Sequence, residues 1–253
     1  MLNVLTHGAP GANPPLLIVH GLYGSGRNWG VIAKRLSDER QVIAPDMRNH
    51  GDSFWSDDHG YPDMAGDLAE VIEAHGGPAD VVGHSMGGKA AMVLALTRPE
   101  LVNRLIVADI APVPYGHSQI QFIKAMRSVD LSAVEKRSDA IEQLAKVVPD
   151  KTLQSFFTQS LDLKEKRWKL NLDGLAQEMP KILSFPDIDG RFDGPVLFLS
   201  GGESDYVLPE HRDRIRTYFP KARFAKLPGT GHWLHAEKPR EFEASVRAFL
   251  SMA

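Results

Sequence analysis

Short runs of apolar residues recur along the chain, separated by longer stretches in which apolar and polar positions mix at helical spacing. The runs lack the polar alternation of a half-exposed strand, so we expect strands that are buried on both faces, as in a parallel sheet. These predicted strands are residues 16–19, 41–44, 80–82, 105–108, 196–199 and 223–227.

The stretches between these runs predict amphipathic helices. Pro99 and Pro220 closely follow two of them, as expected where a helix ends. The predicted helices are residues 29–36, 64–75, 88–97, 210–219 and 240–251. Strands that alternate with helices indicate an α/β fold with a mostly parallel, doubly wound sheet, which binds ligands at the carboxyl ends of its strands.

Residues 112–191 break this alternation, because they contain several helix-like stretches and no convincing buried strand. Polar and apolar residues mix there at helical spacing, so an apolar side of these helices can cover the sheet edge. We therefore predict a core domain formed by residues 1–111 and 192–253, with a helical cap inserted at residues 112–191.

The composition agrees with one α/β domain that binds a small molecule. The chain has 253 residues, is 43% hydrophobic, and carries 29 basic and 32 acidic residues without the basic clusters of a nucleic-acid surface. With no cysteine, disulfides and thiolate catalysis are excluded. Its N-terminus does not resemble a signal peptide, and no apolar run reaches the ~20 residues that span a bilayer. We expect a cytoplasmic monomer or small homo-oligomer without membrane insertion.

One motif carries most of the predicted chemistry. Gly83-His84-Ser85-Met86-Gly87 fits the pattern Gly-x-Ser-x-Gly between a predicted strand and a predicted helix. A sharp strand-to-helix turn leaves no room for side chains at its glycine positions and holds the serine hydroxyl at the helix N-terminus. This context is typical of the nucleophile elbow of an α/β hydrolase, so Ser85 is the predicted nucleophile. The alternative is a glycine turn that serves packing alone.

The same segment also begins like a phosphate-binding loop, because residues 83–89 read Gly-x-x-x-x-Gly-Lys. The residue after Lys89 is Ala90, whereas that loop needs a hydroxyl there to hold magnesium. Nucleotide binding is therefore disfavoured.

Two further segments predict the rest of the catalytic apparatus. His20-Gly21-Leu22 follows the first predicted strand, so the backbone amides of Leu22 and Met86 are the predicted oxyanion hole. His232 lies in a loop between the last strand and the last helix, where this fold carries its base. His235 is the nearest rival, and strand alternation predicts that His84 points elsewhere.

The acid that orients the histidine is ambiguous. Asp109 follows the strand at 105–108, whereas Ser204 and Asp205 follow the strand at 196–199, which is the more usual position. Either aspartate can hold the histidine tautomer and stabilise its cation. At least one of the two carboxylates then serves only as a cap or a solvated loop residue.

Together these residues resemble the α/β-hydrolase esterases of the bacterial YbfF type and their mitochondrial abhydrolase-domain relatives, over nearly the whole chain. The resemblance rests on seven segments, one of which contains the glycine motif. They are residues 20–25, 46–53, 83–90, 109–113, 168–172, 201–204 and 231–239.

The resemblance implies a serine esterase that acts on short acyl esters or acyl thioesters, acyl-CoA included, with no metal and no organic cofactor. It also implies that Asp109 holds His232 while Ser204 adds a hydrogen bond, and Asp205 departs from the family pattern. Residues 46–53 offer two aspartates and a histidine in no familiar metal spacing, so we interpret this loop as a hydrogen-bonded brace.

Other functions remain compatible with the same residues. The fold also hosts carbon–carbon bond hydrolases, perhydrolases and lyases on one triad, and the sequence does not separate them. A non-catalytic receptor of this fold is less favoured, because the sequence contains the predicted nucleophile, the predicted base and the predicted oxyanion loop.

Overall fold

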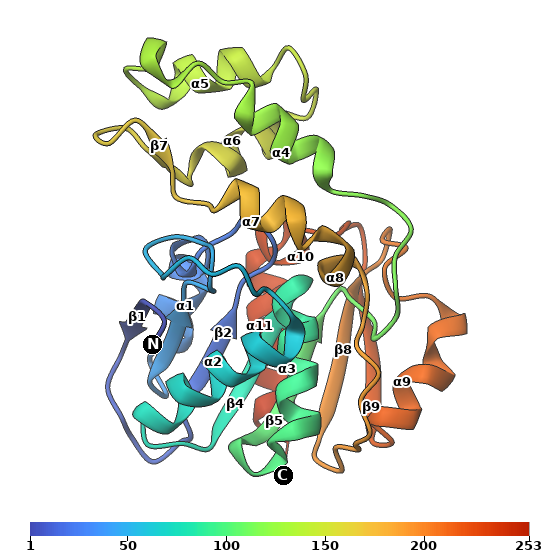
Figure 1. Cartoon of the computed structure of the whole chain (residues 1–253). Helices are drawn as coiled ribbons and strands as arrows, with labels where there is room; N and C mark the ends of the chain where they lie inside the picture. The colour runs from blue at the N-terminus through green and yellow to red at the C-terminus, as the bar shows by residue number, and fades with distance from the viewer. Residues whose placement is uncertain (253) are drawn as a thin grey trace.

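The computed structural model describes residues 1–252, and its centre is a seven-stranded sheet (Figure 1). The strand order is β1-β3-β2-β4-β5-β8-β9, and β1 alone pairs antiparallel, with β3. The sheet strands are β1 (Val4–His7), β2 (Leu16–Val19), β3 (Val42–Pro45), β4 (Ala79–His84), β5 (Val102–Ala108), β8 (Val196–Gly201) and β9 (Ala222–Leu227). The mostly parallel α/β-hydrolase sheet predicted from the sequence is confirmed.

Helices cover both faces of this sheet. The core helices are α1 (Gly30–Leu36), α2 (Tyr61–Ala74), α3 (Met86–Thr97), α9 (Arg212–Tyr218), α10 (Leu234–Glu237) and α11 (Pro239–Leu250), with 3₁₀ turns at Gly26–Trp29, Pro99–Leu101 and Pro209–His211. Helices α1 and α11 share one apolar cluster with the sheet, whereas α2, α3 and α9 belong to the cluster on the other face. Strand β4 is buried along its whole length between these layers.

We call residues 112–191 the cap segment, and they lie above the carboxyl ends of the strands (Figure 1). The segment contains α4 (Ile120–Arg127), α5 (Arg137–Leu144), α6 (Lys151–Thr158), α7 (Leu172–Gln177), α8 (Met179–Leu183), a 3₁₀ turn at Leu131–Ala133 and the short hairpin β6 (Leu161–Asp162) and β7 (Arg167–Trp168). Its elements are thus mainly helical. The division of the chain into a core and a cap domain stays a prediction.

Several predicted boundaries need correction. Helix α2 begins at Tyr61, with Pro62 in its first turn, rather than at residue 64. The helix predicted at residues 29–36 is α1 (Gly30–Leu36), and the 3₁₀ turn at Gly26–Trp29 precedes it. Strand β1 was not predicted, because its four residues form a half-exposed edge that is held by pairing with β3 rather than by its own hydrophobicity.

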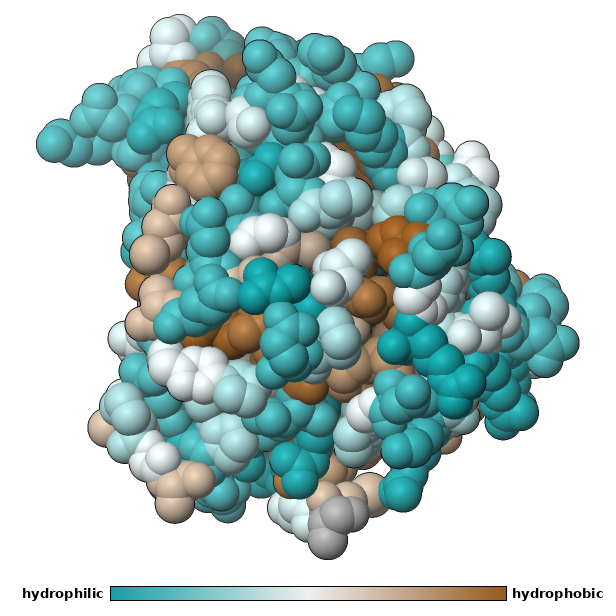
Figure 2. Space-filling view, turned by 60° about the horizontal axis from the view of Figure 1, so that its bottom comes forward, coloured by the Kyte–Doolittle hydropathy of each residue, from teal (hydrophilic) through white to brown (hydrophobic). Residues whose placement is uncertain are grey.

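Apolar side chains are mostly inside the molecule. The face in Figure 2 is largely hydrophilic, and hydrophilic residues break up its hydrophobic areas. Phe54 and Trp55 are 41% and 53% exposed, which is ordinary for scattered apolar residues. Among residues 1–252, every helix is too short or too polar to cross a bilayer.

The loop of residues 46–53 connects three parts of the core through one carboxylate. Asp46 accepts hydrogen bonds from the backbone amides of Gly26 (2.8 Å) and Asp52 (2.9 Å) and from Asn3 Nδ2 (2.8 Å). Ser53 Oγ donates to the carbonyl of Asp46. These bonds make the loop the brace that the sequence predicts, and both oxygens of Asp46 are already occupied by donors.

We predict that Asp46→Asn lowers the free energy of unfolding by about 2 kcal/mol or more, because hydrogen bonds to a charged acceptor contribute about 1.5–3 kcal/mol. Urea denaturation followed by circular dichroism measures this change. Asp52→Asn is the matched control, since the Asp52 side chain is 56% exposed and, within residues 1–252, forms an ion pair only with Lys169. Equal stability of the two variants would contradict the brace.

Candidate active site

Ser85 lies at the turn between β4 and α3 in a conformation that few residues adopt, with φ +53° and ψ −120°. Two glycines make this turn possible. A Cβ on Gly83 would be 2.5 Å from the Gly87 carbonyl oxygen, and one on Gly87 would be 2.4 Å from the His20 carbonyl oxygen. Because real Cβ atoms do not approach so closely, both positions require glycine, and the turn holds Ser85 at the N-terminus of α3.

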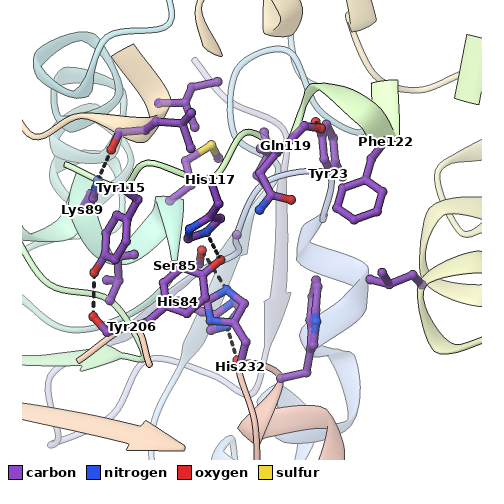
Figure 3. Close-up of a pocket in the computed structure, with 18 of the residues that line it drawn as sticks. Tyr23, His84, Ser85, Lys89, Tyr115, His117, Gln119, Phe122, Tyr206 and His232 are labelled. Atoms are coloured by element: carbon purple, nitrogen blue, oxygen red, sulfur yellow. Dashed lines mark hydrogen bonds between the residues drawn. The ribbon is translucent and has the colours of Figure 1, made fainter. Parts of the chain in front are cut away.

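Three side chains from separate segments form a continuous hydrogen-bonded chain. Figure 3 shows its first link, between Ser85 and His232. Ser85 Oγ is 3.1 Å from His232 Nε2, and His232 Nδ1 is 2.8 Å from Asp109 Oδ2. Asp109 directly follows β5 with φ +52° and is fully buried. In the neutral tautomer that fits both contacts, Nδ1–H donates to Asp109 and Nε2 accepts the proton of Ser85.

The structure separates the two candidate aspartates. The Asp109 carboxylate also accepts hydrogen bonds from the Gly201 amide (2.9 Å) and from Ser204 Oγ (2.5 Å). Asp205 is exposed, and among residues 1–252 it makes no hydrogen bond to His232. The carboxylate that contacts His232 is therefore at the end of β5, and the loop after β8 contributes the hydroxyl of Ser204.

The backbone amides of Leu22 and Met86 flank Ser85. A Cβ on Gly21 would be 3.2 Å from Ser85 Cβ and 2.9 Å from His84 Nδ1, so the Leu22 loop packs directly against the elbow. Leu22 and Met86 both line the cavity above Ser85. Within residues 1–252, neither amide donates a hydrogen bond to another protein group.

Two buried histidines, His20 and His50, form hydrogen bonds that hold the loop around Leu22. His20 Nε2 accepts from the Met47 amide (2.9 Å), and His50 Nε2 accepts from the Tyr23 amide (3.1 Å). Only neutral rings can accept in this way. Burial lowers the pKa of His20, and burial together with the neighbouring His20 holds the pKa of His50 well below its usual value. Neither hydrogen bond was predicted from the sequence.

The other histidines near Ser85 lie behind His232. The sequence predicts that His84 points elsewhere than to Ser85, and its Nε2 is 2.9 Å from the His232 carbonyl oxygen, while its ring lies beside the His232 ring. His235 stacks on Trp29 at 4.2 Å between ring centroids. Burial lowers the pKa of His235 to about 3, and its Nδ1 has no hydrogen-bond partner among residues 1–252. His235 is therefore placed for packing.

A cavity of about 220 Å³ opens above Ser85, and its walls are mainly apolar. Figure 3 shows Lys89, Tyr115 and Tyr206 on one side of Ser85, and Tyr23 and Phe122 on the other. The cap segment and the core both contribute to the walls. The cap residues are Tyr115, His117, Gln119, Phe122, Leu153, Phe157, Ile182 and Leu183.

Tyr206 contacts His232, the predicted base, and was not singled out from the sequence. Its ring stacks on that of His232, with 3.9 Å between centroids and 21° between planes. Its hydroxyl is 2.7 Å from His117 Nε2, and its carbonyl accepts from Tyr115 Oη (2.7 Å). Tyr206 therefore covers one face of His232 and links it to the start of the cap segment.

The chain is similar to known proteins in both sequence and fold. The model of the "Alpha/beta hydrolase family" matches residues 16–245. The chain is 42% identical to the mouse sn-1-specific diacylglycerol lipase ABHD11, over 94% of this chain and 81% of the relative. It is 36% identical to Esterase YbfF of Escherichia coli strain K12, over 94% of both proteins. A solved "Marine microorganism esterase" superposes with a TM-score of 0.93 at 39% identity, covering 98% of each chain.

A family model that spans most of the chain and relatives that cover nearly all of it leave one conclusion: the chain belongs to the alpha/beta hydrolase family, as a carboxylic ester hydrolase of the YbfF type.

Proposed function

We propose that this esterase hydrolyses short-chain acyl esters and acyl thioesters through an acyl-enzyme on Ser85, with His232 as the general base and Asp109 as the orienting acid. The observation that carries this proposal is the hydrogen-bonded chain from Ser85 through His232 to the buried Asp109, at the base of an apolar cavity.

In the acylation step, Ser85 Oγ bonds to the carbonyl carbon while its proton passes to His232 Nε2. The carbonyl oxygen becomes an oxyanion, and the amides of Leu22 and Met86 donate to it; each such donor contributes about 3 kcal/mol. Collapse of this intermediate breaks the bond to the alcohol or thiol, which leaves with the proton from His232. Water then attacks the acyl-enzyme by the same steps, which releases the acid and restores Ser85.

Asp109 orients His232 and does not itself take a proton in this cycle. It holds the Nδ1–H of His232 and stabilises the imidazolium that forms when Nε2 accepts the serine proton. Its bonds from Gly201 and Ser204 keep the carboxylate fixed in position. We assign Ser204 an auxiliary role and Asp205 no part in the reaction.

The size and polarity of the cavity support the proposed substrate class. About 220 Å³ is less than the roughly 300–1,000 Å³ of pockets for drug-sized ligands. Apolar walls favour an alkyl chain, and a short acyl group fills this space. We propose that the cap segment sets this size, as a domain that closes the pocket over the core.

We predict that Ser85→Ala lowers the turnover of p-nitrophenyl acetate by at least about 10³-fold, because it removes the attacking atom. The wild type is expected to react covalently with a fluorophosphonate at Ser85, and mass spectrometry identifies the labelled residue. A wild-type protein that stays unlabelled would point to a non-catalytic receptor instead.

The acid assignment predicts a ranking of three variants. Asp109→Asn is expected to lower kcat by up to about 10⁴-fold, because an amide favours the wrong tautomer of His232. Ser204→Ala loses one auxiliary hydrogen bond, so we expect a loss near tenfold. Asp205→Asn is the matched control, with kcat within about twofold of the wild type. A large loss confined to Asp205→Asn would return the acid to the loop after β8.

The proposed oxyanion hole depends on the space at Gly21. We predict that Gly21→Ala lowers kcat by at least about tenfold, because its Cβ displaces the Leu22 loop from Ser85. Gly66→Ala is the control, since a Cβ at that helical position meets no atom within 4 Å. Steady-state kinetics and thermal unfolding of both variants separate a catalytic effect from a loss of folding. Equal kcat in the two variants would refute the proposed role of this loop.

A further inference from the structure

Lys89 is a buried cation that the proposed reaction does not use. It lies in the first turn of α3, four residues after Ser85, and is only 1% exposed. A helix N-terminus disfavours a positive charge, and burial disfavours any charge that lacks a partner. Within residues 1–252, no carboxylate lies within 4.0 Å of its ammonium group. Its position therefore needs another explanation.

The ammonium group of Lys89 is held by carbonyl oxygens and aromatic rings. Nζ donates to the carbonyl oxygens of Leu183 (3.0 Å) and Ser184 (2.6 Å), at the C-terminal end of α8. It also lies 4.8 Å from the centre of the Tyr115 ring and 5.7 Å from that of Tyr61, within the range of cation–π attraction. Figure 3 shows the Lys89 bond beside Tyr115. Lys89 thus joins the helix that carries Ser85 to the last helix of the cap segment.

The end of α8 is also a wall of the substrate cavity. Ile182 and Leu183 both line the space above Ser85. Two other groups of the chain fasten the same turn: Tyr61 Oη donates to the Ile182 carbonyl (2.5 Å), and the Tyr115 amide donates to the Leu183 carbonyl (3.0 Å). Of the three residues that donate these hydrogen bonds, Lys89 is the one in the first turn of α3, the helix that follows Ser85.

We propose that Lys89 is a positioning residue that fixes the wall of Ile182 and Leu183 relative to Ser85, and so determines the length of substrate chain that the cavity accepts. This inference rests on the proposed role of Ser85. If the hydrogen bonds of Lys89 are lost, Ile182 and Leu183 can move away from Ser85, and longer substrate chains then fit. The preference of the enzyme for short chains is then expected to decline. The attacking atom and its base are untouched by such a change.

The strength of this fastening is expected to vary with pH. Burial lowers the pKa of Lys89 to about 7. Among residues 1–252, the ionisable side chains that contact its ammonium group are Tyr61 and Tyr115, whose rings face it. Burial raises the pKa of both tyrosines, so they stay protonated. As the pH rises through about 7, the ammonium becomes a neutral amine, which binds carbonyl oxygens more weakly. Selectivity for short chains is therefore highest below pH 7 and declines above it.

The test compares wild type, Lys89→Met and Lys146→Met, in which Lys146 is an exposed lysine of the cap segment. Two ester series are used, one with acyl groups from acetyl to decanoyl and one with acetates of lengthening alcohols. We expect Lys89→Met to lower the ratio of kcat/KM for the shortest to the longest chain by about tenfold or more in one of these series. Lys146→Met is expected to keep the wild-type ratio.

Fluorophosphonate labelling of Ser85 is measured in parallel, and its rate in Lys89→Met is expected to stay within about threefold of wild type. A wild type that does not label would refute the proposed function, which is a separate result from any change in chain selectivity. An unchanged ratio in both series, in a folded Lys89→Met protein, would overturn the role of Lys89.

The wild-type enzyme gives an independent test that needs no substitution. Its ratio for short over long chains is expected to decline between about pH 6 and about pH 8.5, in the range where Lys89 loses its proton. If Lys89→Met does not fold, this measurement alone decides, and a constant ratio over that range would overturn the proposal.

Discussion

The backbone of Gly87 touches the end of β2 so closely that no other residue fits there, and this contact sets the geometry of the whole site. A Cβ at Gly87 would be 2.4 Å from the carbonyl oxygen of His20, and the neighbouring Gly83 is equally confined. Because α3 begins against the strand that leads into Gly21 and Leu22, the elbow and the amide loop cannot move independently. Steric exclusion therefore fixes the positions of Ser85 and of the Leu22 and Met86 amides, in addition to any hydrogen bond.

Few side chains around this contact carry an ionic charge. His20, His50, His84 and His235 are all buried with lowered pKa values, and each packs as a neutral ring at or behind the loops that carry Ser85, Leu22 and His232. A buried charge is tolerated where its partners are built in, as at Asp109, which accepts from His232, Gly201 and Ser204. In such an environment a charge that develops on a substrate oxygen is stabilised chiefly by fixed dipoles rather than by water.

The sequence predicted the features that local pattern encodes, and it was silent on those that arise from contact. The elbow motif, the buried runs and the order of serine, acid and histidine all follow from spacing, and the strands that they predict are those of the observed sheet apart from β1. Asp109 and Asp205 both follow strands, so only the side-chain contact with His232 separates them. Tyr206 stacks on His232 without any periodic signal. Lys89 belongs to a disfavoured phosphate-loop pattern, and that pattern does not indicate its actual partners, which lie 94 and 95 residues away.

Asp109 lies only three residues before the cap segment begins at Pro112, yet its contacts lie in the core. Its amide donates to the Leu199 carbonyl, and its carboxylate accepts from Gly201 and Ser204, so its anchors beyond β5 lie on β8 and the loop after it. None of these three anchors belongs to the cap segment. These contacts of Asp109 therefore do not depend on the length or composition of the cap segment.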